Sequence, residues 1–279
     1  MELAFQLWPT SPAPVAPETK GRKAKRITFL HGMGGTGALW RPIAASLESH
    51  YSLLALDQRG HGGSRPAQPA TYTPLDFGRD VIETLGIQNF HPTWLIGHSM
   101  GVRSACAAAH MKPEWIQGLI LVDLGFYGPA GGGLGEELAY FLRILPEGFP
   151  SREEAKRFMT EHCPDPAMGQ YLMAVSVRDA GGSIRFAFDH SALIQTVEAS
   201  KNNSIREWIR ELGERGMPIL ALRGAESGVW SHNEFEEEKQ RFADLPSIVF
   251  REIEGAGHGL PFEQRARFVE AVEGFISTD

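Results

Sequence analysis

The chain lacks the features that mark disulfide-rich secreted domains, membrane-spanning proteins and nucleic-acid-binding proteins. Its 279 residues include only two cysteines, Cys106 and Cys163, too few for a disulfide framework. No segment approaches the ~18 apolar residues that a membrane-spanning helix needs, and the N-terminus has no signal-peptide pattern. The net charge of −7 argues against affinity for nucleic acid or for an anionic membrane surface. We therefore expect a soluble, cytoplasmic protein.

What the chain does contain is a regular alternation of short apolar runs and helical stretches. Hydrophobic residues make up 42% of the sequence, enough for a sizeable core. The apolar runs are rich in leucine and β-branched residues, as in strands buried on both faces of a sheet, and a helical pattern lies between most of them. They cover residues 27–30, 53–56, 94–96, 119–122, 219–222 and 248–250. This alternation predicts an α/β fold with a mostly parallel, doubly wound sheet.

One long interval breaks the alternation. Residues 125–217 show mostly helical patterning and are too numerous for an ordinary connection between strands. We predict a mainly helical cap inserted after the strand that ends at Asp123. Its aromatic residues and methionines are suited to roofing an apolar pocket. The core would then consist of residues 1–124 and 218–279.

Residues 97–101, GHSMG, carry the signature of a nucleophilic serine. An apolar strand precedes them and a helix of small residues follows. A serine on a sharp strand-to-helix turn needs glycine on either side because the backbones pack closely there. The start of the following helix directs backbone N–H groups at any oxyanion that forms. We therefore predict that Ser99 is the nucleophile.

A second glycine-rich turn, residues 31–37 (HGMGGTG), follows the strand at 27–30 and has two interpretations. In one, the turn aims the backbone N–H of Met33 at the substrate of Ser99. In the other, the glycines form a dinucleotide fingerprint, with Asp57 twenty residues after Gly37 as the acid that binds a ribose. We favour the first because the nucleotide interpretation leaves Ser99 without a role. A nucleotide site remains the minor alternative.

The base and the acid come later in the chain. Among ten histidines, His258 alone lies on a small-residue loop after the last predicted strand, where it can reach Ser99. His31, His61 and His98 accompany glycine turns and are expected to support them. For the acid, Asp123 ends a strand beside the nucleophile strand, whereas Glu226 follows the penultimate strand, two residues before the glycine at an expected aspartate position. We favour Asp123 and keep Glu226 as the alternative.

Taken together, these motifs resemble the α/β-hydrolase superfamily over nearly the full length, and more narrowly its YbfF-type esterase and thioesterase branch. The resemblance rests on residues 31–34, 57–64, 97–101, 122–123, 224–227 and 255–258. It implies a triad of Ser99, Asp123 and His258, with Ser227 in support. It also implies oxyanion donors at the Met33 and Met100 N–H groups. Glu226 departs from the asparagine of that branch.

The expected function is hydrolysis of a carboxylic ester or thioester with a small to medium acyl group, through an acyl-Ser99 intermediate. This chemistry requires no metal or organic cofactor, and we expect none. The expected partner is the small-molecule acyl substrate alone. Two alternatives stay open: a carbon–carbon bond hydrolase or lyase that uses the same three residues, and a receptor of this fold that binds a small molecule without catalysis.

Overall fold

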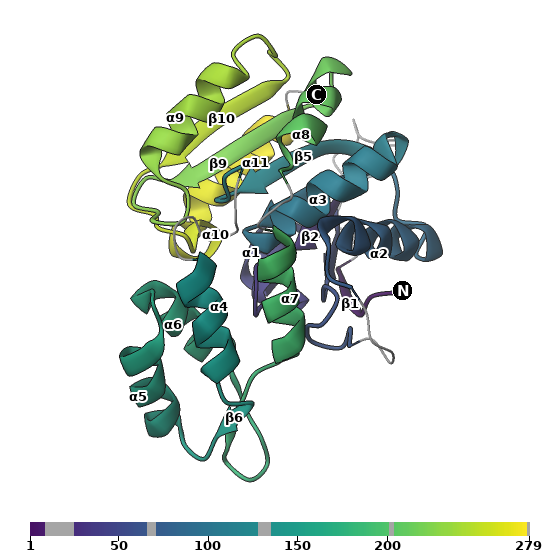
Figure 1. Ribbon diagram of the computed structural model, residues 1–279. Coiled ribbons are helices and arrows are strands. Elements are labelled where there is room, and N and C mark those ends of the chain that lie inside the picture. Colours follow the sequence, from purple (N-terminus) through teal and green to yellow (C-terminus); the bar gives the residue numbers. More distant parts are fainter. Residues whose placement is uncertain (9–24, 66–70, 128–134, 201–203, 278–279) are drawn as a thin grey trace.

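A seven-stranded sheet forms the centre of the molecule in the computed structural model, which describes residues 1–8, 25–65, 71–127, 135–200 and 204–277 (Figure 1). The strand order is β1-β3-β2-β4-β5-β9-β10, and only β1 runs antiparallel to its neighbour. The strands are β1 (Phe5–Trp8), β2 (Arg26–Leu30), β3 (Ser52–Leu56), β4 (Thr93–His98), β5 (Ile116–Val122), β9 (Ile219–Gly224) and β10 (Ile248–Ile253). The α/β fold with a mostly parallel sheet is confirmed.

Helices cover both faces of this sheet, which explains why the strands are apolar at nearly every position. In β4, Leu95 packs into the core on the side of α2 (Pro74–Ile87) and α3 (Met100–Met111). Its neighbours Trp94 and Ile96 pack into the opposite core. That second core also includes residues of α1 (Arg41–Leu47) and α11 (Arg265–Ser277). Successive side chains of a strand point to opposite faces, so both sets must be apolar.

The segment between β5 and β9 holds a separate group of elements, which we call the insertion and define as residues 135–200. Most of it lies below the main sheet in Figure 1, and it has its own apolar cluster. It comprises α4 (Gly135–Ile144), β6 (Gly148–Phe149), α5 (Arg152–His162), α6 (Pro166–Val175), β7 (Val177–Arg178), β8 (Ile184–Arg185) and α7 (His190–Ser200). The three strands form a small antiparallel sheet in the order β6-β8-β7.

One helix from the interval expected to form the cap lies elsewhere. α8 (Arg206–Glu214) packs against α3, and its Ile209 and Leu212 belong to the core of the main sheet. The remaining helices are α9 (His232–Arg241), α10 (Leu260–Glu263) and the short η2 (Gly37–Trp40) and η3 (Pro113–Trp115). Residues 128–134 and 201–203 of the predicted cap lie outside the described residues.

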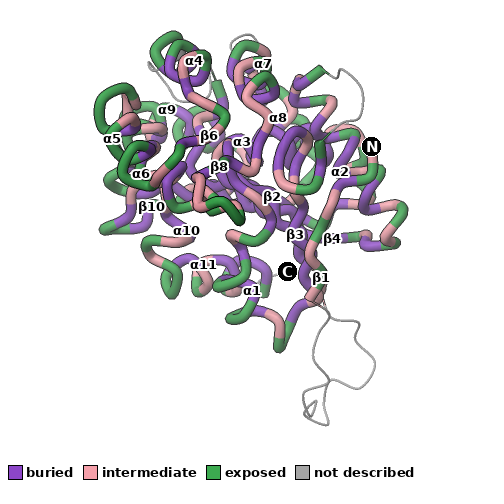
Figure 2. Tube along the Cα trace, turned by 90° about the horizontal axis from the view of Figure 1, so that it is seen from below, coloured by how far each residue is buried: buried purple, intermediate pink, exposed green. Residues whose placement is uncertain are grey.

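Buried residues concentrate in the strands and on the inner sides of the helices, while the outer surface of α5 is exposed (Figure 2). Among the described residues, no helix is both long enough and apolar enough to cross a membrane. The carboxyl ends of the parallel strands meet at one edge of the main sheet, and the residues singled out from the sequence follow those ends.

Candidate active site

Ser99 occupies a strained turn between β4 and α3. Its backbone has φ 53° and ψ −120°, a conformation that side-chain-bearing residues rarely adopt. A Cβ atom on Gly97 would lie 2.3 Å from the Gly101 carbonyl oxygen, and one on Gly101 would lie 2.3 Å from that of Leu30. Both positions therefore require glycine. The tight turn presents the Ser99 side chain beyond the sheet edge, partly accessible, at the start of α3.

His258 and Asp123 continue a chain of hydrogen bonds from Ser99. The His258 Nε2 atom lies 3.0 Å from Ser99 Oγ, and its Nδ1 atom lies 2.8 Å from Asp123 Oδ2. The His258 side chain is 27% exposed, whereas the Asp123 carboxylate is fully buried. Asp123 directly follows β5 and has φ 54°. The structure thus brings together the three residues that the sequence selected as nucleophile, base and favoured acid.

Two further donors satisfy the buried Asp123 carboxylate. The Gly224 N–H donates to Oδ1 at 2.9 Å, and the Ser227 hydroxyl donates to Oδ2 at 2.5 Å. Ser227 therefore lies where the resemblance implied. A buried carboxylate without such donors would be costly to desolvate. These bonds also fix the carboxylate relative to His258.

Glu226, the alternative acid, has a different environment from Asp123. Its side chain is exposed to solvent, and its backbone N–H donates to the Ala256 carbonyl at 2.8 Å. Within the described part of the chain, no hydrogen bond joins its carboxylate to His258. The geometry therefore favours Asp123.

The glycine-rich turn at 31–37 is held by hydrogen bonds from its own backbone. The Gly34 N–H donates to His61 Nε2 at 3.0 Å, and the Gly35 N–H donates to the Gly32 carbonyl at 3.1 Å. These two N–H groups are therefore already engaged in holding the turn. The Met100 N–H lies at the start of α3, directly after Ser99.

Asp57, the residue that gave the turn its likeness to a dinucleotide site, has a structural role. Its Oδ1 accepts the Gly37 N–H at 2.7 Å, and its Oδ2 accepts the Gly63 N–H at 2.9 Å. Both carboxylate oxygens thus tie two backbone turns together. These two hydrogen bonds explain why an aspartate lies twenty residues after Gly37 without assigning it a ribose-binding role.

Three buried histidines, His31, His61 and His98, support the backbone around the site. The sequence predicted only that they support glycine turns. Burial lowers the pKa of His61 and of His98 to about 4, and it lowers the pKa of His31 well below the ordinary value. They are therefore neutral near pH 7. Because His61 Nε2 accepts from Gly34, its proton must reside on Nδ1, which donates to the Arg59 carbonyl at 2.9 Å.

His98 and His31 make equally specific contacts. The His98 Nε2–H donates to the His258 carbonyl at 2.8 Å and so holds the loop that carries the candidate base. His31 Nε2 accepts the Gln58 N–H at 2.9 Å, while its Nδ1–H donates to the Gly32 carbonyl at 2.7 Å. Each neutral ring thus joins two segments that lie far apart in the sequence and close to Ser99 in space.

Apolar side chains surround this site on the side of the insertion. Met33 packs against the cluster formed by Tyr72, Phe77, Met100 and Ala192. Met33 also packs against the insertion's own cluster. A Cβ on Gly34 would lie 2.9 Å from Leu172 of α6, so the insertion directly contacts the glycine-rich turn at 31–37.

Comparisons with known proteins identify a family to which this chain is similar. A model described as the alpha/beta hydrolase family matches residues 29–271. A putative esterase/lipase of Haemophilus influenzae is 25% identical over 251 residues, covering 90% of this chain and 83% of the relative. A 2-(acetamidomethylene)succinate hydrolase of Mesorhizobium japonicum is 23% identical over 252 residues, covering 90% of this chain and 87% of the relative.

Solved structures show the same fold. A marine microorganism esterase has a TM-score of 0.72 at 22% identity, with 98% of this chain and 99% of the other covered. An E-2-(acetamidomethylene)succinate hydrolase has a TM-score of 0.76 at 21% identity, with 91% of this chain and 92% of the other covered. With the family model spanning most of its length, the chain belongs to the alpha/beta hydrolase family.

Proposed function

We propose that the protein is a serine hydrolase that cleaves carboxylic esters or thioesters through an acyl-Ser99 intermediate. The observation that carries this proposal is the hydrogen-bonded chain from Ser99 Oγ through His258 to Asp123, with distances of 3.0 and 2.8 Å. This is the arrangement that a serine nucleophile, a general base and an orienting carboxylate require.

In the first step, His258 Nε2 removes the Ser99 proton as Oγ attacks the acyl carbon. The Met33 and Met100 N–H groups stabilise the oxyanion, each contributing roughly 3–4 kcal/mol to lowering the barrier. The protonated His258 then gives its proton to the departing alkoxide or thiolate. In the second step, His258 deprotonates a water molecule, whose attack on the acyl-enzyme releases the acid and restores Ser99. Asp123 stabilises the imidazolium in both steps.

We propose that the insertion acts as a cap over this site and that its α6 and α7 help to form the acyl pocket. The contact between Leu172 and Gly34 and the packing of Ala192 against Met100 support this role. The surrounding cluster is apolar, which suits a hydrocarbon acyl chain. We therefore favour a simple acyl group over the dicarboxylate named in the relative from Mesorhizobium japonicum.

The decisive experiment combines covalent labelling with a substrate panel. A fluorophosphonate probe should label the wild-type chain and leave Ser99→Ala unlabelled. p-Nitrophenyl esters and acyl-CoA thioesters of increasing chain length would then separate ester from thioester activity. Labelling that persists in Ser99→Ala would contradict the proposal. Tight ligand binding without acylation would favour a receptor, and turnover of a diketone but of no ester would favour a carbon–carbon hydrolase.

The acid is tested with a matched pair of variants. Asp123→Asn should lower kcat about ten-thousand-fold because the amide favours the wrong imidazole tautomer. Glu226→Gln makes the same chemical change on an exposed side chain and should alter kcat less than about two-fold. A crippled Glu226→Gln enzyme beside an active Asp123→Asn enzyme would reverse the assignment.

A further inference from the structure

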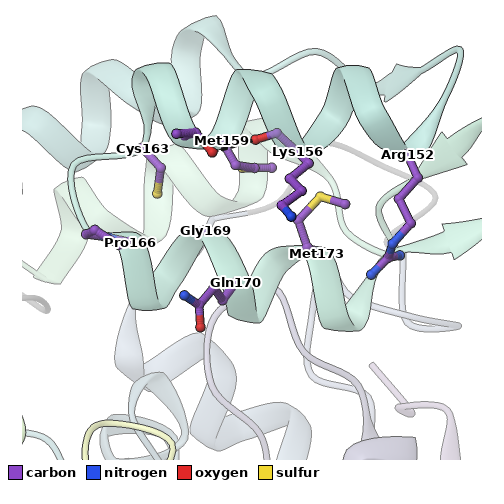
Figure 3. Close-up of a pocket in the computed structure, with 9 residues that line it drawn as sticks. Arg152, Lys156, Met159, Cys163, Pro166, Gly169, Gln170 and Met173 are labelled. Carbon is purple, nitrogen blue, oxygen red and sulfur yellow. Dashed lines mark hydrogen bonds between the residues drawn. The ribbon is translucent and has the colours of Figure 1, made fainter.

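The insertion contains a hollow that the proposed reaction does not use. It lies between α5 and α6 and has a volume of about 410 Å³ (Figure 3). Pockets that hold small ligands typically measure about 300–1,000 Å³. The buried Met159 and Met173 and the half-buried Cys163 form much of its apolar wall. Its size and lining are therefore those of a small-molecule site.

Two cations stand at this hollow without a matching anion. Arg152 and Lys156 are four residues apart on α5, and both line the pocket (Figure 3). None of the lining residues carries a carboxylate. Among the described residues, neither cation takes part in an ion pair, whereas Arg143 and Arg185 of the same insertion pair with Glu198 and Asp179.

The hollow lies on the opposite side of α6 from the glycine-rich turn at 31–37. Gly169, Gln170 and Met173 face the hollow. Tyr171 and Leu172 instead meet the turn, where a Cβ on Gly35 would lie 2.5 Å from the Tyr171 hydroxyl. With 3.6 residues per turn, these two sets occupy opposite faces of one helix. The hollow is therefore separate from the acyl pocket.

We propose that this hollow binds an anionic amphiphile, a carboxylate attached to a short hydrocarbon chain. The carboxylate would lie between Arg152 and Lys156, where charge-assisted hydrogen bonds from both side chains are available. The chain would lie along Met159 and Met173, whose flexible thioethers adapt to irregular apolar ligands. This site is independent of the proposed function, because it uses neither Ser99 nor the acyl pocket.

The test uses Cys163 as a reporter inside the hollow and sodium octanoate as the probe. The other cysteine, Cys106, is fully buried and inaccessible to the reagent, so it does not compete for alkylation in the folded chain. The rate of Cys163 alkylation by iodoacetamide, followed by mass spectrometry of the intact chain, should fall at least about five-fold at saturating octanoate. Neutral 1-octanol should protect far less.

Two variants of α5 test where octanoate binds. Arg152→Gln combined with Lys156→Gln should remove protection by octanoate, and both side chains are exposed, so the fold should persist. Arg157→Gln is the matched control: it removes a cation from the same helix at a different hollow, shared with Glu154 and Glu161, and should leave protection unchanged. No protection in the wild type, equal protection in the double variant, or equal protection by octanol would each overturn the proposal.

Discussion

The buried histidines make a quantitative prediction about acid stability, and His98 is the sharpest case. Its pKa is lowered to about 4, first by burial and then by the nearby His258. In the unfolded chain its pKa returns to about 6.5. Well above pH 6.5 the ring is neutral in both states, and the free energy of unfolding does not depend on its protonation. As the pH falls from 6.5 toward 4, only the unfolded state binds the proton, so stability is lost.

The size of the effect follows from the number of protons. At pH 5 the unfolded histidine holds about one proton more than the native one, so it contributes a slope of about 1.2 kcal/mol per pH unit. Between pH 7 and pH 5 the native state loses about 2 kcal/mol through this residue. His61, with the same pKa of about 4, adds a similar amount, and His31 acts in the same direction. Together they should remove a large part of a typical 5–15 kcal/mol stability.

His98→Gln tests this reasoning because glutamine keeps an amide N–H for the His258 carbonyl but does not titrate. Urea unfolding, followed by the fluorescence of the six tryptophans, should be measured from pH 7 to pH 5. Any packing lost in the variant shifts its stability equally at every pH. Near pH 5 the variant's slope should therefore be shallower than that of the wild type by about 1.2 kcal/mol per pH unit. Identical slopes would refute the conclusion that native His98 stays neutral.

Three further variants test the packing around the site. Tyr171→Phe removes a buried hydroxyl that has no hydrogen-bond partner among the described residues, so it should raise the free energy of unfolding by about 1 kcal/mol in urea; a loss of that size would reveal a hidden partner. Gly35→Ala places a Cβ 2.5 Å from that hydroxyl and should lower kcat/KM by displacing the glycine-rich turn at 31–37, and adding Tyr171→Phe should restore part of the loss. Thr73→Ala removes one half of the capping box of α2 and should cost about 1 kcal/mol in thermal unfolding without changing kcat.

Local sequence patterns were sufficient for the sheet and for the nucleophile turn. Strands between two helical layers must be apolar on both faces, so their runs stand out without any knowledge of the fold. The strand β4 begins one residue before and ends two residues after the apolar run predicted at 94–96. Such differences of a residue or two at element ends leave the geometry of the site unchanged.

Contacts between segments that are distant in the sequence could not be predicted from the sequence alone. An amphipathic helix such as α8 carries the same pattern whichever apolar surface it covers, so its packing against α3 rather than in the insertion was not predictable. Likewise, the histidines lie beside glycine turns, but their partners are far along the chain. His61 and Gly34 are 27 residues apart, and His98 and His258 are 160 residues apart.

The choice between Asp123 and Glu226 shows why the candidate acid required a structure. β5 and β9 are parallel neighbours, with Val122 opposite Leu222, so the residues after both strands reach the same edge of the sheet. Sequence alone therefore places either carboxylate near His258. In the structure, the end of β9 and the loop after it contribute hydrogen-bond donors to the candidate acid: the Gly224 N–H and the Ser227 hydroxyl both bind Asp123. The two strands thus contribute to the same site: the residue after β5 provides the carboxylate, and the end of β9 and its loop provide the donors that fix the position of that carboxylate.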